Sequence, residues 1–276
     1  MKVKDTFSYY KSEYMPNITL LNASICDFKY KRHAHEDFAI GVTESGYQSF
    51  YCNGQYHKVP AGGIMLINPE ELHDGYSETK YGYTYNMLYI PKGIFKEVYK
   101  EVSGYKSYDF RFKNTVLFNK NLSNQLMIFM NLVKRNRLDN LLGEEQFLNI
   151  ITQLIAENNC LEIDSNSVKT DGKVVREAKE FIASNLNRKI SIDEVAQNVN
   201  VSKYHFIRMF KKHTGRTPYQ YTIECRIEAV RKAIEDGEDI LYSAEKYGFC
   251  DQGHLNRRFK EVYGITPYRF KNCFYT

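Results

Sequence analysis

The chain has 276 residues and a formal net charge of +5, from 38 Lys and Arg against 33 Asp and Glu. This length holds two domains that can each bury a core. No apolar stretch reaches membrane-spanning length, and Met1–Asp5 lacks the apolar segment of a secretory signal, so we expect a cytoplasmic protein with no membrane partner. The six cysteines, at positions 26, 52, 160, 225, 250 and 273, show no close pairing or metal-ligand spacing, which fits reduced thiols.

Residues 1–115 are typical of an all-β domain. Tyr, Phe, Val and Ile occur in short runs that Gly, Pro and Asn interrupt. Asn53-Gly54 is a strong hairpin signal because both residues tolerate the positive φ of a tight turn. The candidate strands are residues 38–42, 48–52, 56–59, 64–67 and 83–90.

Three histidines accompany these strands. His33 and His35 precede the first strand and are two residues apart, which places both imidazoles on one side of an extended segment. His73 comes later in the chain, after Asn68-Pro69. Between the first two histidines and His73, Pro60-x-Gly62 marks a turn. This order resembles the cupin domain, a double-sheet barrel whose cavity holds a metal ion or a small ligand.

The metal ligands of the cupin enzymes provide a test of this resemblance. Their pattern has a Glu four or five residues after the second His, where this chain has Ala39 and Ile40. A further His is replaced by Met65. Because two of the four ligands are missing, we expect no metal cofactor and no catalytic residues. A zinc site formed by the three histidines stays open as an alternative, and a pocket for an organic ligand is favoured.

The strand at residues 83–90 carries aromatic side chains at every second position. Such a face meets either the cavity or the opposite sheet. An ordinary packed core explains the same stripe, so both interpretations stay open. The predicted ligand-binding residues are His33, His35, His73, Tyr83, Tyr85 and Met87.

Residues 121–137 and 144–158 have helical periodicity and predict two amphipathic helices beside the barrel. A polar stretch over residues 161–173 follows, rich in Asp, Ser, Asn and Thr, and predicts an interdomain linker.

A repeat occupies the C-terminal part. Phe210-Lys211, Gly215 and Thr217-Pro218-Tyr219 recur 49 residues later, beginning at Phe259. In each copy a short helix, a turn and a longer capped helix are predicted: Ser191 and Ser202 cap the first pair, and Asp251 caps the second long helix. This is the helix-turn-helix pattern, whose second helix enters the major groove. Thr217-Pro218 predicts a rigid helix to about residue 234 between the two units.

Charge separates the repeat from the rest of the chain. Residues 172–276 hold 19 Lys and Arg against 13 Asp and Glu, whereas residues 1–171 hold 19 against 20. The basic excess therefore lies with the helix-turn-helix units, as the neutralisation of DNA phosphates requires.

On these motifs, over about 100 residues from Val174 to Phe274, the chain resembles the AraC/XylS family of bacterial transcription regulators. Many members carry a cupin-type sensor domain, and in the arabinose-responsive member Tyr85 and Met87 correspond to effector-contacting positions. The resemblance implies double-stranded promoter DNA and a small-molecule effector as partners. It also implies a homodimer formed through the amphipathic helices and, for an activator, RNA polymerase.

The family pattern and the exposed faces of the two long helices indicate which side chains contact DNA. Arg pairs with guanine, and Gln and Asn suit adenine, whereas Ile207 can touch only a thymine methyl group. A solvated polar face is the alternative for each of them. The predicted DNA-binding residues are Lys203, Tyr204, Ile207, Arg208, Lys211, Gln252, His254, Asn256, Arg257 and Lys260.

The sequence thus predicts a two-domain α+β protein. A cupin-like sensor and dimerisation domain spans residues 1–160, with the barrel at 1–115 and its helices at 121–158, and an all-α double helix-turn-helix domain spans 174–276. The predicted function is that of a sequence-specific transcription regulator, an activator, controlled by an effector in the barrel. A cupin-type metalloenzyme fused to a DNA-binding domain, or a sensor that binds a partner protein or nothing, is the alternative.

Overall fold

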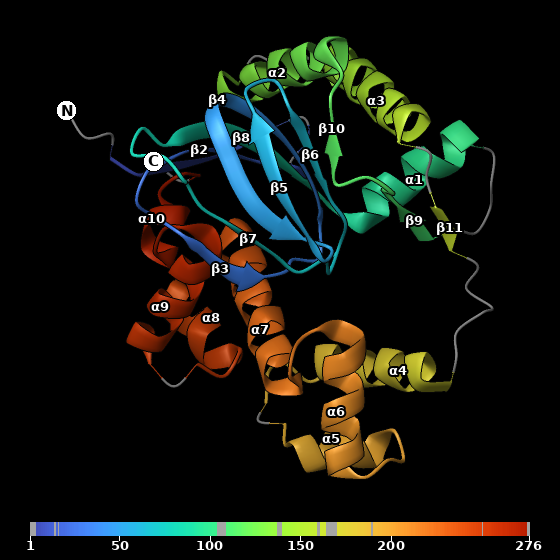
Figure 1. The fold of residues 1–276 in the computed structure, drawn as a ribbon. Coiled ribbons are helices and arrows are strands. Elements are labelled where there is room, and N and C mark those ends of the chain that lie inside the picture. Colours follow the sequence, from blue (N-terminus) through green and yellow to red (C-terminus); the bar gives the residue numbers. More distant parts are fainter. Residues whose placement is uncertain are drawn as a thin grey trace. The chain divides into compact units, whose positions relative to one another are not determined.

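The structure, a computed structural model, describes residues 4–13, 15, 17–103, 109–136, 140–158, 161–163, 170–188, 190–249 and 251–274. The chain divides into two compact units, residues 1–164 with 272–276 and residues 165–271. The first unit contains the strands and the second is helical (Figure 1). Within the described ranges, every helix is too short or too polar to cross a bilayer.

The first unit is built on a sheet that has nine strands among the described residues. Strands β1, β2, β8, β4, β6 and β10 follow one another in this order; β5 and β7 pair with β4, and β3 pairs with β7. Their bounds are Thr6–Lys11 for β1, Thr19–Ile25 for β2, Tyr30–His33 for β3, Phe38–Cys52 for β4, Gln55–Pro60 for β5, Ile64–Ile67 for β6, His73–Gly75 for β7, Tyr83–Ile90 for β8 and Val116–Leu117 for β10.

Strand β4 joins the two walls of the barrel. Its first half pairs with β6 and β8, and its second half pairs with β5 and β7. The predicted strands 38–42 and 48–52 are therefore one strand, which bends where the register shifts between Thr43 and Ser45. Gly46 has a φ of 74°, and a Cβ there would lie 2.5 Å from the Gly82 carbonyl oxygen, so only glycine fits this bend. The Asn53-Gly54 hairpin is confirmed between β4 and β5.

Three helices cover the outer face of this sheet. Helices α2 (Lys120–Lys134) and α3 (Asn140–Glu157) confirm the two predicted amphipathic helices, and α1 (Lys92–Ser103) is additional. Helix α2 lies across β1, β2, β4 and β8, and α3 packs on α1 and α2 (Figure 1). One apolar core of this unit lies between helices and sheet. It includes Leu20, Ile40, Leu66, Leu88, Phe95, Leu126, Phe129, Phe147 and Leu154.

The predicted linker is shorter than expected. Leu161–Ile163 forms strand β11, which pairs with β9 (Asp109–Arg111), because its alternating apolar residues complete a small second sheet. Helix α4 (Thr170–Ser184) begins before the predicted end of the linker. Residues 164–169 lie outside the described residues, as do Cys160 and Cys250. In the part of the chain that the structure describes, Cys26, Cys52, Cys225 and Cys273 form no disulfide bond.

The second unit repeats one three-helix arrangement. Helices α4, α5 (Ile192–Asn198) and α6 (Lys203–Thr214) form the first copy, and α7 (Pro218–Glu235), α8 (Ile240–Lys246) and α9 (Gln252–Tyr263) form the second. Helix α10 (Pro267–Lys271) follows. Helix α7 thus serves both as the predicted connecting helix and as the first helix of the second copy. Phe210 and Phe259, which correspond in the repeat, are both fully buried.

The predicted caps define the helix starts. Ser191, Ser202, Thr217 and Asp251 each accept a hydrogen bond from a backbone N–H three residues ahead, which confirms all four. The Glu194 carboxylate pairs with Arg188, at 2.5 Å, and also accepts a backbone hydrogen bond at Ser191; both interactions lower its pKa. The short helix of the second copy, α8, begins at Ile240 because Asp239 caps it.

Candidate nucleic-acid interface and sensor cavity

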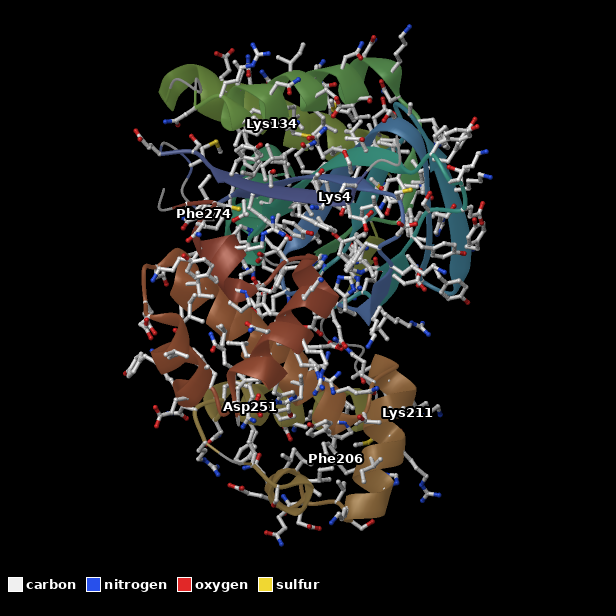
Figure 2. The ribbon with its side chains drawn as sticks, turned by 90° about the vertical axis from the view of Figure 1, so that its left-hand side faces the viewer. Lys4, Lys134, Phe206, Lys211, Asp251 and Phe274 are labelled. Atoms are coloured by element: carbon white, nitrogen blue, oxygen red, sulfur yellow. The ribbon has the colours of Figure 1, made fainter. Side chains whose placement is uncertain are left out.

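Helix α6 has an apolar inner side and a basic outer side. Phe206 and Phe210 are buried against α4, α5 and α7, whereas Arg208 and Lys211 are exposed. Figure 2 shows Phe206 on the inner side of the helix and Lys211 pointing away from it. Ile207 is half-buried, and the Tyr204 side chain lies outside the described residues. The exposed face of α6 is therefore cationic.

Lys203 begins this face and is tied to the neighbouring helix. Its Nζ lies 2.7 Å from Asp193 Oδ2 on α5. Both side chains are well exposed, so the ion pair contributes little stability, and the ammonium can exchange it for a DNA phosphate at small cost.

Helix α9 presents a related but different set. Gln252, Arg257 and Lys260 are exposed, while His254 and Asn256 are half-buried. The His254 ring packs edge-on against the buried Phe249, with the ring centres 5.5 Å apart. His254 thus partly packs against the turn before α9, and the exposed polar side chains among the residues assigned on α9 are Gln252, Arg257 and Lys260.

Helix α7 holds α9 through a buried ionic network. The Tyr263 hydroxyl donates to Glu228 Oε2 at 2.6 Å, and Arg231 Nε donates to Glu228 Oε1 at 3.1 Å. Burial raises the pKa of Glu228, but the charge and hydrogen bonds of Arg231, with Lys232 and Tyr263, lower the pKa to about 2. With 18 residues, α7 is about 27 Å long. This length is of the same order as the spacing between successive major grooves, roughly 34 Å.

The barrel interior contains a small cavity. Its volume is about 20 Å³, enough for roughly one water molecule. It receives side chains from both walls of the barrel, and five of the six predicted ligand-binding residues line it. The lining consists of Tyr30, His33, His35, Gln48, Phe50, Met65, Ile67, His73, Asp74, Tyr85, Met87 and Tyr89.

The three histidines form one cluster. The centre of the His73 ring lies 4.4 Å from that of His33 and 4.9 Å from that of His35. Each Nδ1 faces a backbone carbonyl, of Lys31, Asp37 or Glu71, at 2.7 to 2.9 Å. Because a carbonyl only accepts, each Nδ1 carries a proton. Burial lowers the pKa of His33, which favours its neutral form.

The cluster is not arranged as a metal centre. Within the described ranges, no group of three or more His, Cys, Asp or Glu side chains has a geometry that could hold a metal ion. The structure therefore gives the zinc alternative no support.

Tyrosines close the cavity on one side. The Tyr30 and Tyr85 hydroxyls lie 2.9 Å apart, and burial raises the pKa of both well above its ordinary value. Tyr83 is buried but does not line the cavity, because it lies further along β8, where its ring packs on Tyr85 with centres 5.6 Å apart. Sequence reasoning missed Tyr30, Gln48 and Tyr89; the alternation along residues 48–50 and 85–89 is the signal that points to the last two.

A larger hollow lies on the helical face of the first unit. It has a volume of about 300 Å³ and is lined by Gln125, Ile128, Gln146, Asn149, Ile150 and Gln153. These side chains come from α2 and α3, the helices predicted to form a dimer interface.

Comparison with known proteins accounts for both units. Residues 16–151 match the model of an AraC-like ligand binding domain, and residues 195–272 match that of a helix-turn-helix domain. The multiple antibiotic resistance protein MarA of Escherichia coli is 36% identical over 103 residues, which cover 37% of this chain and 81% of MarA. The chain belongs to the AraC family. It is a transcription regulator with a ligand-binding domain and a DNA-binding domain.

Other relatives of this AraC-family chain match over more of its length. An uncharacterised HTH-type transcriptional regulator of Bacillus subtilis, YbfI, is 27% identical over 82% of each chain. A crystal structure of apo ToxT from Vibrio cholerae, carrying one substitution, matches with a TM-score of 0.65 and 12% identity, covering 93% of this chain and 97% of ToxT. Another solved ToxT structure is described as bound to an unsaturated fatty acid. At this identity the likeness concerns the fold.

Proposed function

We propose that both helix-turn-helix units of this regulator read one promoter site, with α6 and α9 in successive major grooves. The observation that carries the proposal is the presence of two capped helices, α6 and α9. Each buries the corresponding Phe of the repeat on its inner side and exposes a polar, basic face. Arg208 and Arg257 are the base-reading residues in this assignment, and Lys203, Lys211 and Lys260 neutralise phosphates. The remaining assigned contacts are Tyr204, Ile207, Gln252, His254 and Asn256.

We further propose that residues 1–160 sense a small organic effector in the barrel and that residues 174–276 transmit its presence to DNA. His33, His35, His73, Tyr85 and Met87 line the cavity and support this role. The fatty acid named with a ToxT structure is a property of that protein, and it makes fatty acids one class to screen.

A second candidate for the sensor is supported by the size of the cavity. At about 20 Å³ it is far smaller than the roughly 300 Å³ or more of ordinary ligand pockets. A sensor that binds a partner protein, or nothing, fits a cavity of this size directly. Thermal unfolding of the full chain with sugars, amino acids, small aromatic acids and fatty acids separates the two, because only an effector raises the unfolding temperature.

The wider proposal follows from membership of the family. The regulator acts in the cytoplasm as a homodimer, activates transcription by contacting RNA polymerase, and has no enzymatic activity. Two residues support the dimer: Ile128 on α2 and Leu148 on α3 are 58% and 37% exposed although apolar.

Selection of bound sequences from a pool of random DNA duplexes tests the DNA proposal. The full chain is expected to enrich a site of two unlike boxes about one helical turn apart. Arg208→Ala is expected to weaken binding by about 1 to 3 kcal/mol and to relax base preference in one box only, because a lost bidentate contact affects the base it reads. Arg257→Ala should do the same in the other box. Affinities of purified variants for the selected duplex provide the measurement.

Arg176→Ala is the matched control. Arg176 is an exposed arginine of α4 that faces Glu180, outside both long helices. Its replacement should leave affinity and base preference unchanged. Enrichment of no sequence, or loss of preference in both boxes from one substitution, would contradict the proposal.

A further inference from the structure

A buried arginine in the connecting helix links the two DNA-reading units. Arg226 lies near the middle of α7 and is only 9% exposed. Its Nη2 donates to the backbone carbonyl of Arg188 at 2.7 Å, and its Nη1 donates to the backbone carbonyl of Gly248 at 3.4 Å. Arg188 precedes α5 of the first helix-turn-helix copy, and Gly248 lies in the turn between α8 and α9 of the second copy. One side chain thus contacts loops of both helix-turn-helix copies.

The contact of Arg226 in the first helix-turn-helix copy reaches a loop that other hydrogen bonds hold in place. The Arg188 side chain donates to Asn185 Oδ1 at 2.7 Å and to Glu194 Oε1 at 2.5 Å, which connects the end of α4 to α5. The Arg188 N–H also bonds to the Asn185 carbonyl. A displacement of the Arg188 carbonyl would therefore carry α5 with it, and α5 packs directly on α6.

The contact of Arg226 in the second helix-turn-helix copy lies immediately before α9, the DNA-reading helix of that copy. Gly248 has a φ of 73°, and a Cβ at this position would lie 3.0 Å from the Arg226 Cζ. Only glycine permits both this backbone conformation and the close approach of the guanidinium. Asp251, three residues later, caps α9. The position of the Gly248 carbonyl therefore bears on where α9 begins.

The chemistry of the link requires arginine. A guanidinium holds several N–H donors in a rigid plane, so it can donate in two directions to two carbonyls at once. A lysine ammonium on its flexible stem cannot impose the same geometry. From these contacts we propose that Arg226 is a positioning residue that fixes the spacing between the two helix-turn-helix units, and thereby the distance between the DNA boxes that one subunit accepts. The inference rests on the proposed reading of DNA by both units.

Binding to duplexes with altered spacing tests this role. The full-length wild type and the variants Arg226→Lys, Arg226→Met and Gly248→Ala are titrated with the selected duplex, with duplexes that have one base pair added or removed between the boxes, and with a duplex that keeps one box. The Arg226 variants are expected to lose about tenfold or more on the selected duplex, as removal of a charge-assisted hydrogen bond implies. They should also discriminate less between spacings while binding the single box like the wild type. Gly248→Ala should show the same pattern, because it displaces the guanidinium.

Arg216→Lys is the matched control. Arg216 is also buried, and its ion pair with Glu224 joins the turn before α7 to the N-terminal half of that helix. This variant should keep the wild-type spacing preference even if its unfolding temperature falls. Arg226 variants that keep the spacing preference, or that lose affinity equally for one box and for two, would overturn the inference and leave a purely structural role. A wild type that selects only one box would instead overturn the two-unit proposal on which it rests.

Discussion

At the scale of single residues, Gly41 controls the space in the barrel. It lies on β4 opposite Met65 of β6 and Met87 of β8. A Cβ at position 41 would lie 2.7 Å from the Met87 Cε and 2.8 Å from the Met65 Cε. Both atoms are the ends of flexible side chains, which rotate at low cost. The two thioether groups are therefore the parts of the lining that can move aside to enlarge the cavity.

Gly41→Ala is expected to abolish the response to an effector while DNA binding persists. The added methyl group pushes both methionines into a cavity of about 20 Å³, so the movable space is lost. Thermal shift with a compound identified in the screen, and titration with the selected duplex, measure the two effects. Gly93→Ala is the control, because a Cβ there meets no atom within 4 Å. An undiminished thermal shift in Gly41→Ala would place the effector elsewhere.

At the scale of elements, α7 is the part of the second unit on which the other helices depend. It contacts α4 and α6 of the first copy and α8, α9 and α10 beyond it. Its buried Glu228 links it to α9 through Tyr263. Because the folded-state pKa is lowered to about 2, the ionised carboxylate stabilises the fold above its ordinary pKa, near 4.5. This stabilisation is lost as the pH falls from about 4.5 toward 2.

Glu228→Gln is expected to destabilise the second unit by roughly 3 kcal/mol at pH 7, because it leaves Arg231 with one carboxylate fewer in a buried site. The deficit should shrink as the pH approaches 2, where the wild-type carboxylate is itself protonated. Amide hydrogen exchange of α7 and α9 against pH measures both. Glu177→Gln, at an exposed pair with Lys173, should cost at most about 0.5 kcal/mol. A deficit that is the same at pH 3 and pH 7 would contradict the assigned pKa.

The elements differ in how far the sequence predicts them. Helices α6 and α9 and strand β8 were predictable because caps, terminal glycines and alternation act over a few residues. Helix α1 was missed because its stability comes from packing on α3 and the sheet, a long-range property. The closure of the cavity depends on Tyr30 approaching Tyr85, residues 55 positions apart, and no local pattern encodes it. Tyr83 was predicted to line the cavity and does not, because alternation along one strand cannot tell which part of its inward face meets the cavity.

At the scale of the whole molecule, the proposed dimer would double the number of DNA-reading helices. The hollow of about 300 Å³ on α2 and α3 has amide groups at its edges, and Gln153 donates to Gln125 across it at 3.0 Å. A second copy seated there would bury Ile128 and find hydrogen-bonding partners nearby. Two subunits would then contact DNA through four helix-turn-helix copies. Binding of one subunit would raise the effective concentration of the other at the DNA and tighten binding without any new contact.

Ile128→Lys is expected to shift the chain from dimer to monomer, because a buried ammonium at the interface lacks a partner. Sedimentation at micromolar concentration provides the measurement. Leu241→Lys is the control, since Leu241 is exposed to a similar extent, 59%, but lies on α8 in the other unit. A wild type that sediments as a monomer, or a dimer unaffected by Ile128→Lys, would contradict the assignment of this surface.

The small cavity also has a consequence in time. If the effector binds in this cavity of about 20 Å³, the methionines and tyrosines of its lining have to move first, and the state that admits the effector is then a minor one. The apparent affinity is then weaker than the intrinsic affinity by the fraction of chains that are open. If opening precedes binding, the observed rate of association reaches a plateau at high effector concentration, set by the opening of the barrel. Under those conditions this regulator would respond at a pace fixed by its own structure and not by the supply of effector.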